Sequence, residues 1–99
     1  MKHKEFVEEL NDTMLSNKIT LQLENGDKEY FFPYGNQFAH QYGMYEPPCI
    51  NMDDMVIYDS VQELKADIDK YDLFIDKMTI AKGGNEDIIE PEDFIAFLK

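Results

Sequence analysis

Carboxylates are the side chains this sequence offers most freely for chemistry, and they concentrate between residues 53 and 76. That stretch holds eight acidic residues against two lysines, Lys65 and Lys70; the acids are Asp53, Asp54, Asp59, Glu63, Asp67, Asp69, Asp72 and Asp76. Clustered carboxylates can bind a divalent cation, act as acid and base on a glycosidic bond, or present negative charge to a basic partner. Each possibility makes a different demand on the neighbouring residues.

A calcium loop is the metal site that this stretch comes nearest to encoding. A loop starting at Asp67 would carry Tyr71 where an EF-hand needs an oxygen ligand, Asp72 where it needs glycine, and Met78 where it needs glutamate. The acidic pair at residues 53–54 offers too few ligands for magnesium. A domain of this size also leaves little room for a saccharide cleft. We therefore expect no metal and no cofactor.

The nucleophiles and bases outside this stretch form no recognisable catalytic pattern. His3, His40 and Cys49 do not have a zinc-site spacing, and no base can be assigned to Cys49. We expect His3 to be solvated, His40 to lie at the surface and Cys49 to be a small buried residue. Residues 83–84 are glycines that lack the lysine and hydroxyl residue of a phosphate-binding loop. The sequence predicts that the protein is not an enzyme.

The charge of the chain limits its partners. Its 21 acids exceed its lysines by 12, and arginine is absent, so it has few cations with which to bind nucleic acid directly. A partner should instead be basic. The start of the chain lacks the apolar core of a signal peptide, and no apolar run is long enough to span a membrane. A single cysteine excludes an intrachain disulfide. These features predict a cytoplasmic protein that does not bind membranes.

The 99 residues predict one compact acidic domain, residues 1–99, of the α+β class. Helical apolar spacing and capping signals, including a Ser60–Glu63 capping box, indicate three helices. Two further apolar runs indicate short strands, with 73–81 forming either one strand or two pieces. We expect a short, mostly antiparallel sheet containing a hairpin at 18–33, strands at 55–58 and 73–81, and helices at 3–15, 61–70 and 91–98.

The hairpin is the strongest local signal. Asn25-Gly26 between two alternating runs is typical of a two-residue type I′ turn, in which both turn residues have positive φ. That turn would pair Leu21 with Tyr30 on the core face. Phe31 would then lie on the outer face, either under another element or exposed to a partner.

Aromatic residues dominate the segment 34–48 that follows the hairpin. Phe38 and Tyr42 are four residues apart, which favours a short helix from Asn36 to Tyr42. The segment either closes over the core or forms an aromatic contact surface, because tyrosine is enriched at interfaces. In the second case Phe31, Tyr42 and Tyr45 would anchor a partner.

The acidic stretch also has two interpretations. It is either a solvated face partly neutralised by Lys65 and Lys70, or a row of carboxylates that occupies a basic groove made for phosphates. In size, acidity and lack of catalytic motifs the chain resembles phage-type inhibitors of DNA-cutting defence enzymes, anti-CRISPR proteins among them, and nuclease immunity proteins. We expect a non-enzymatic inhibitor that mimics DNA and binds a basic nucleic-acid-binding enzyme through the eight acids, with the aromatic residues as anchors. The alternative is an accessory or regulatory module that binds protein through segment 34–48, with acidity serving solubility only.

Overall fold

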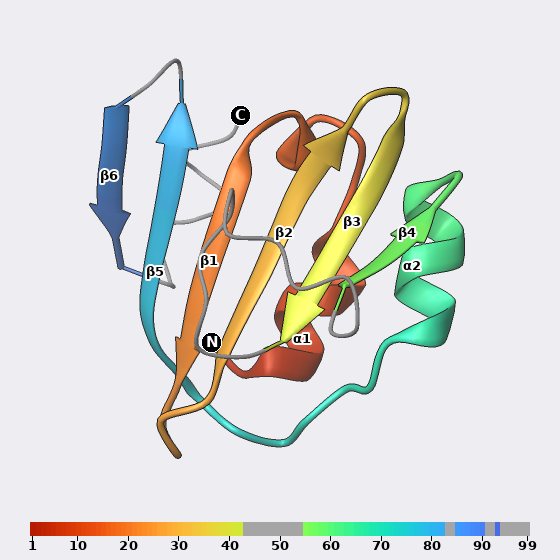
Figure 1. The fold of residues 1–99 in the computed structure, drawn as a ribbon. Helices are drawn as coiled ribbons and strands as arrows, with labels where there is room; N and C mark the ends of the chain where they lie inside the picture. The colour runs from red at the N-terminus through yellow and green to blue at the C-terminus, as the bar shows by residue number, and fades with distance from the viewer. Residues whose placement is uncertain (43–54, 83–84, 91–92, 94–99) are drawn as a thin grey trace.

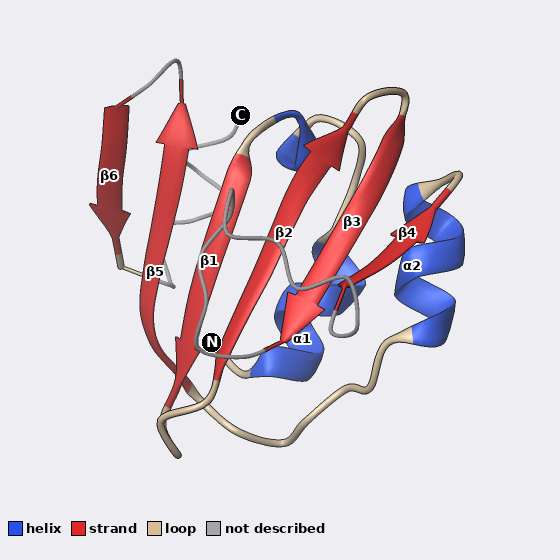
Figure 2. Cartoon of the chain, in the orientation of Figure 1, coloured by secondary structure: helices blue, strands red, loops and turns tan. Residues whose placement is uncertain are grey.

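An antiparallel sheet of six strands forms most of the structure. The computed structural model describes residues 1–42, 55–82, 85–90 and 93, and these arrange the strands in the order β4-β3-β2-β1-β5-β6 (Figure 1). The strands are β1 (Lys18–Leu23), β2 (Lys28–Tyr34), β3 (Gln37–Tyr42), β4 (Met55–Tyr58), β5 (Ile75–Lys82) and β6 (Asn85–Ile89). Two short helices, α1 (His3–Glu9) and α2 (Val61–Asp67), lie on one face of the sheet (Figure 2). We call this face the helix face.

The expected α+β domain with a sheet packed by three helices is therefore wrong, because the described structure is mostly sheet with two short α-helices. The helix expected at 3–15 ends at Glu9, since Leu10 adopts an extended ψ of 137°. Asn11 Oδ1 then accepts the backbone N–H of Met14, a local bond that competes with helix continuation and begins the 3-10 helix η1 (Met14–Ser16). The helix expected at 91–98 lies outside the described residues.

The β1–β2 hairpin exists, but its register differs by one residue from the expected one. Asn25 does not have a positive φ, whereas Gly26 has a φ of 93°. Gly26 N–H donates to the Leu23 carbonyl and Leu23 N–H to the Asp27 carbonyl, as in a three-residue loop with a glycine bulge. A one-residue shift moves every side chain of a strand to the opposite face.

The shifted register determines which residues enter the core. β1 pairs Ile19 with Phe31 and Leu21 with Glu29, so Phe31 and Glu29 face the helices. Tyr30, which we expected opposite Leu21 in the core, lies on the other face with Phe32, Ala39 and Met55. The carboxylate of Glu29 is thus carried into the helix-face core.

The segment from Gln37 to Tyr42 is strand β3 and not the expected helix. Gly35, with a φ of 62°, is the first residue of a two-residue turn that returns the chain beside β2. Residues four apart share a face in a strand as well as in a helix, so the spacing of Phe38 and Tyr42 fits either structure. The turn decides between them.

The main core lies between the helix face and the helices. Phe6 and Val7 of α1 and Leu64 of α2 are buried, together with apolar residues of β1, β2 and β5 (Ile19, Leu21, Phe31, Met78 and Ile80). α2 packs beside β3 and β4, while β6 forms the opposite edge of the sheet. The strand predicted at 73–81 is present as one continuous strand, β5, from Ile75 to Lys82. Strand β6 was not predicted from the sequence. Within the described residues, no helix has the length and apolar character needed to cross a membrane.

Candidate functional site

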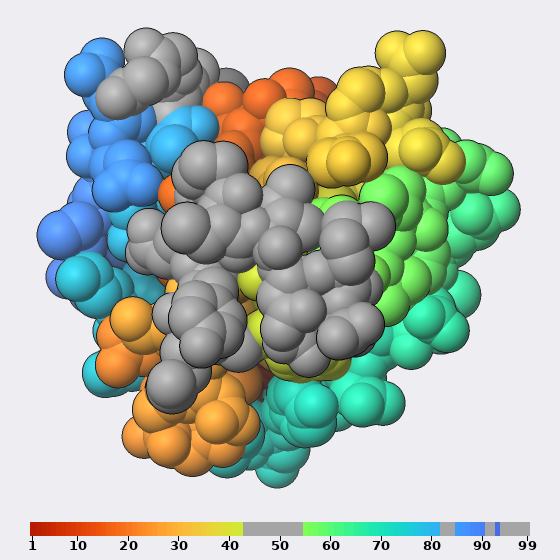
Figure 3. Space-filling view, in the orientation of Figure 1, coloured from red at the N-terminus to blue at the C-terminus, as the bar shows by residue number. Residues whose placement is uncertain are grey.

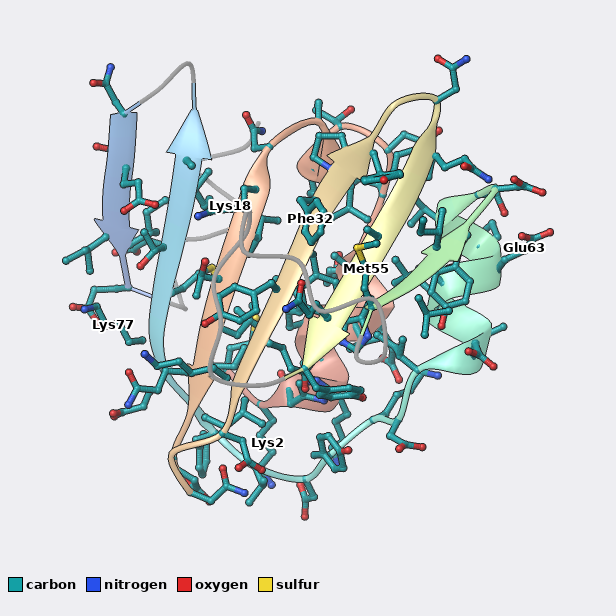
Figure 4. All side chains as sticks on the ribbon, viewed as in Figure 1. Lys2, Lys18, Phe32, Met55, Glu63 and Lys77 are labelled. Carbon is teal, nitrogen blue, oxygen red and sulfur yellow. The ribbon has the colours of Figure 1, made fainter. Side chains whose placement is uncertain are left out.

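Four of the predicted acidic residues follow one another along α2 and its two ends. We call Asp59, Glu63, Asp67 and Asp69 the acidic ridge. Ser60 caps α2 by accepting the Glu63 N–H at 3.2 Å, and the Glu63 carboxylate in turn accepts the Asp59 N–H at 3.3 Å. All four side chains are exposed, and Glu63 projects outward from α2 (Figure 4).

The ridge carboxylates are held by neutral donors. Gln37 on β3 donates its side-chain amide to Asp59 at 2.7 Å, and the Tyr58 hydroxyl donates to Asp67 at 2.6 Å. Burial and the bond to Asp67 raise the pKa of Tyr58 to about 12. A neutral donor fixes the direction of a carboxylate without cancelling its charge.

The two lysines of this region donate to backbone carbonyls and not to the ridge carboxylates. Lys65 donates to the backbone carbonyl of Glu8 at 2.7 Å, and Lys70 donates to the carbonyl of Lys65 at 2.8 Å. In the described part of the chain, no ion pair joins either lysine to a ridge carboxylate. The ridge therefore keeps its negative charge.

The two other predicted acids that the structure describes, Asp72 and Asp76, do not join the ridge. Asp72 forms ion pairs with Lys2 at 2.7 Å and Lys4 at 3.3 Å, and the hydrogen bond from Lys2 is the largest of the effects that lower its pKa. Asp76 is exposed on β5, at the far end of the sheet from α2. Figure 3 shows these two ends of the sheet at opposite sides of the molecule. Residues 53–54 lie outside the described residues.

The predicted aromatic anchors are also separated. Phe31 is fully buried beneath α1, with its ring centroid 5.5 Å from that of Phe6, so it offers no surface to a partner. Tyr42 is half-buried on the helix face. Tyr45 and Cys49 lie outside the described residues. Of the three predicted anchors, Tyr42 is the one that the structure describes and that a partner could reach.

A buried acid–base cluster is the feature that sequence reasoning missed. Glu29, His3 and His40 are 1%, 0% and 2% exposed, so both histidines are far from the surface positions we expected. His3 Nε2 lies 2.8 Å from Glu29 Oε1, and His40 Nε2 lies 3.1 Å from Glu29 Oε2. The carboxylate is therefore shared between two imidazoles, one from α1 and one from β3.

Hydrogen bonding defines the protonation of one of these histidines. The backbone N–H of Tyr71 donates to His3 Nδ1 at 3.0 Å, so this nitrogen carries a lone pair and the ring proton is on Nε2. The Nε2–H is close to Glu29 Oε1 without aiming along the line to it, so the contact is more electrostatic than a well-formed hydrogen bond. The cluster thereby ties α1, β2 and the loop after α2 together.

The electrostatics of the cluster keep Glu29 ionised. Burial, the largest single effect, raises the pKa of Glu29, but the contacts with His3 and His40 together lower it further, to a net value below the ordinary one. The two imidazoles contact different oxygens of one carboxylate. Among the described residues, no group of three or more His, Cys, Asp or Glu side chains has the arrangement of a metal site.

A pocket of about 470 Å³ borders the cluster. It lies between the β1–β2 turn and the loop after α2, and is lined by Leu23, Gly26, Asp27, Lys28, Glu29, Tyr42 and Tyr71. Burial, the charge of Glu29 and a hydrogen bond with Tyr71 raise the pKa of Tyr42. The residues of the pocket are far apart in sequence. The alternation of β2 would have placed Glu29 on the helix face only if the register of the β1–β2 hairpin had been known.

No protein-family model, no curated protein and no solved structure matches this chain. The acidic ridge and the pocket beside the buried cluster are the two regions of the described structure that bear on function.

Proposed function

We propose that the protein is a non-enzymatic inhibitor that binds the basic nucleic-acid-binding surface of another protein through the acidic ridge. One observation carries this proposal. The ridge carboxylates are exposed, yet Gln37, Tyr58 and the backbone N–H of Asp59 hold three of them without neutralising them. Charges that are fixed before binding lose less conformational entropy when they meet a partner.

The spacing of the ridge is compatible with phosphate mimicry. Glu63 and Asp67 are separated by one helical step of about 6 Å, near twice the roughly 3.4 Å axial distance between phosphates of one DNA strand. Like charges four residues apart oppose helix formation slightly. A basic groove would relieve that repulsion. The formal charge of −12 would speed association with such a surface.

The class of partner follows from this chemistry. We expect the groove on a nucleic-acid-binding enzyme, because phage anti-defence proteins, including anti-CRISPR proteins, and nuclease immunity proteins act on such enzymes. The competing hypothesis, a module that binds through segment 34–48, places the contact on β3 and its neighbours. The two hypotheses predict opposite effects of changing the ridge.

The test compares two triple variants with equal loss of charge. Asp59→Asn, Glu63→Gln and Asp67→Asn together alter the ridge, whereas Asp76→Asn, Asp87→Asn and Glu90→Gln alter exposed acids at the opposite end of the sheet. Partners captured by the immobilised wild-type protein are identified by mass spectrometry. Their affinities for all three proteins are then measured with and without competing duplex DNA.

The proposal expects a captured nucleic-acid-binding protein that duplex DNA displaces. It also expects at least about tenfold weaker binding by the ridge variant, because several charge contacts are lost at once, and little change with the control variant. Equal losses of partner affinity in the ridge variant and the control variant would mean that binding depends on net charge alone and not on the position of the ridge. Binding that survives the ridge changes but fails in Tyr42→Ala would favour the aromatic module.

A further inference from the structure

The pocket beside the buried cluster has two aromatic walls that are held from behind. The edge of the Tyr42 ring meets His40 with centroids 4.3 Å apart and planes at 88°. The Tyr71 ring packs against His3 at 4.9 Å. Both tyrosines are half-buried and line the pocket. Their rings are therefore positioned by the histidines before any ligand arrives.

The charged groups at the pocket are mostly negative. Glu29 is ionised and lines the wall from β2, while Asp27 contributes a carboxylate anchored by the side-chain amide of Asn25 at 3.0 Å. The hydroxyl of Tyr71 lies 3.5 Å from a carboxylate oxygen of Asp69, so the acidic ridge ends next to the same tyrosine. The pocket and the ridge are thus neighbouring parts of one acidic surface.

Among the described residues that line the pocket, Lys28 is the cation. Although Lys28 is among the lining residues, it alternates with Glu29 along β2, and strand alternation directs the side chains of neighbouring residues to opposite faces of the sheet. Lys28 is also exposed, and its charge is accordingly screened by water. His40 Nε2 lies 3.1 Å from a carboxylate oxygen of Glu29 within the core. Among the described residues, neither Lys28 nor His40 forms a hydrogen bond with the carboxylate of Asp27.

We infer that this pocket binds the guanidinium group of an arginine side chain presented by the basic partner. A guanidinium is planar, weakly hydrated and able to stack on tyrosine rings while it donates to a carboxylate. An anion would be repelled by Asp27 and Glu29, and a neutral ligand would lack the charge attraction to them. The source of the arginine rests on the proposed function, whereas the chemistry of the pocket does not.

The pocket is tested without the partner by titrating the full chain with N-acetyl-arginine methylamide. The isosteric citrulline derivative, which is neutral, serves as the matched ligand. Amide chemical shifts of Asp27, Tyr42 and Tyr71 are followed by NMR. We expect saturable shifts with the arginine ligand and at least about fivefold weaker binding of the citrulline ligand, because the cation–π and carboxylate contacts require the charge.

Variants locate the binding on the protein. Tyr71→Leu removes one wall and should abolish saturable binding; Asp27→Asn keeps an acceptor for Asn25 but removes a charge, and should weaken binding several-fold. Tyr34→Leu, at an exposed tyrosine on the far end of β2, is the control and should bind as the wild type does. If Tyr71→Leu does not fold, Asp27→Asn alone decides.

Equal binding of the two ligands, or no saturable shift at these amides, would overturn the inference. The ridge variant should still bind the arginine ligand. Failure in the arginine titration is therefore distinguishable from failure of the proposed function, which is judged by the partner affinity of the ridge variant.

Discussion

The same chemical group is used in two opposite ways within this molecule. Glu29 is buried, and each oxygen of its carboxylate contacts an imidazole from a distant part of the chain. The carboxylates of the acidic ridge are exposed, and three of them are held by an amide, a hydroxyl and one backbone N–H. Among the described residues, Glu29 is the one acidic side chain that is not exposed.

This difference separates stability from recognition. A buried charge must be paired, because leaving one unpaired in the core costs several kcal/mol. An exposed charge contributes little to stability, and it remains available to a partner when no cation is bound to it. We therefore expect substitutions at Glu29 to act on folding and substitutions on the ridge to act on binding.

The largest effect should come from Glu29→Ala. It removes the buried carboxylate that the Nε2 atoms of His3 and His40 contact, so the free energy of unfolding should fall by about 2–5 kcal/mol, at roughly 1–3 kcal/mol for each buried polar group left without a partner. Urea denaturation measures this loss. The matched substitution Glu63→Ala removes an exposed carboxylate of the ridge and should cost no more than about 1 kcal/mol. Equal losses would remove the distinction between the two kinds of carboxylate.

Acid should weaken the contribution of Glu29. Its pKa in the folded protein is lowered from the ordinary 4.5 by its histidine contacts, which outweigh burial. Its ionised form therefore contributes stability above pH 4.5, and that contribution disappears as the pH falls through the lower folded value. Glu29→Gln lacks this contribution. The difference in unfolding free energy between this variant and the wild type should therefore shrink as the pH is lowered from about 7 to about 3.

Asp72→Asn is the exposed counterpart for this measurement. The pKa of Asp72 is also lowered, chiefly by its hydrogen bond from Lys2, but solvent screens the pair. Its stability difference from the wild type should be smaller than that of Glu29→Gln at both pH values. A Glu29→Gln difference that does not change with pH would show that Glu29 does not titrate as a paired carboxylate.

The cap of α2 should have an intermediate effect. Ser60→Ala removes the acceptor of the Glu63 N–H, so unfolding should become easier by about 1 kcal/mol. Ser16→Ala is the control, because its hydroxyl donates to an exposed carbonyl of Thr13 and caps no helix N-terminus. If the two substitutions cost the same, α2 does not hold the ridge through its cap.

Local patterns in the sequence predicted the elements whose signals lie within a few residues. Alternation gave β1 and β2, the apolar run 55–58 gave β4, and Ser60 with its capping pattern gave the start of α2. Each of these signals depends on neighbours along the chain. The position of the acidic ridge followed from the same information, because α2 carries it.

The buried cluster could not be predicted in this way. Its partners come from residues 3, 29 and 40, and bringing them together requires the correct register of two hairpins. Asn25-Gly26 favours a two-residue turn, yet the Asn25 side chain accepts the N–H of Asp27 and Gly26 alone takes positive φ. That one-residue difference decides whether Glu29 faces the core or the opposite side of the sheet.

The smallest effect tests how neutral donors hold the ridge. Tyr58 donates to Asp67, and burial followed by this bond raises the pKa of Tyr58 to about 12 from an ordinary 10.0. Asp67→Asn removes the charge that favours the protonated phenol, so the pKa of Tyr58 should fall toward 10.0 but stay above it, because burial remains. NMR titration of the tyrosine ring resonances measures this shift. Glu63→Gln, one helical turn away, should leave the pKa of Tyr58 unchanged. An equal fall of this pKa in both variants would mean that Tyr58 responds to the total negative charge of the ridge and not to a fixed hydrogen bond with Asp67.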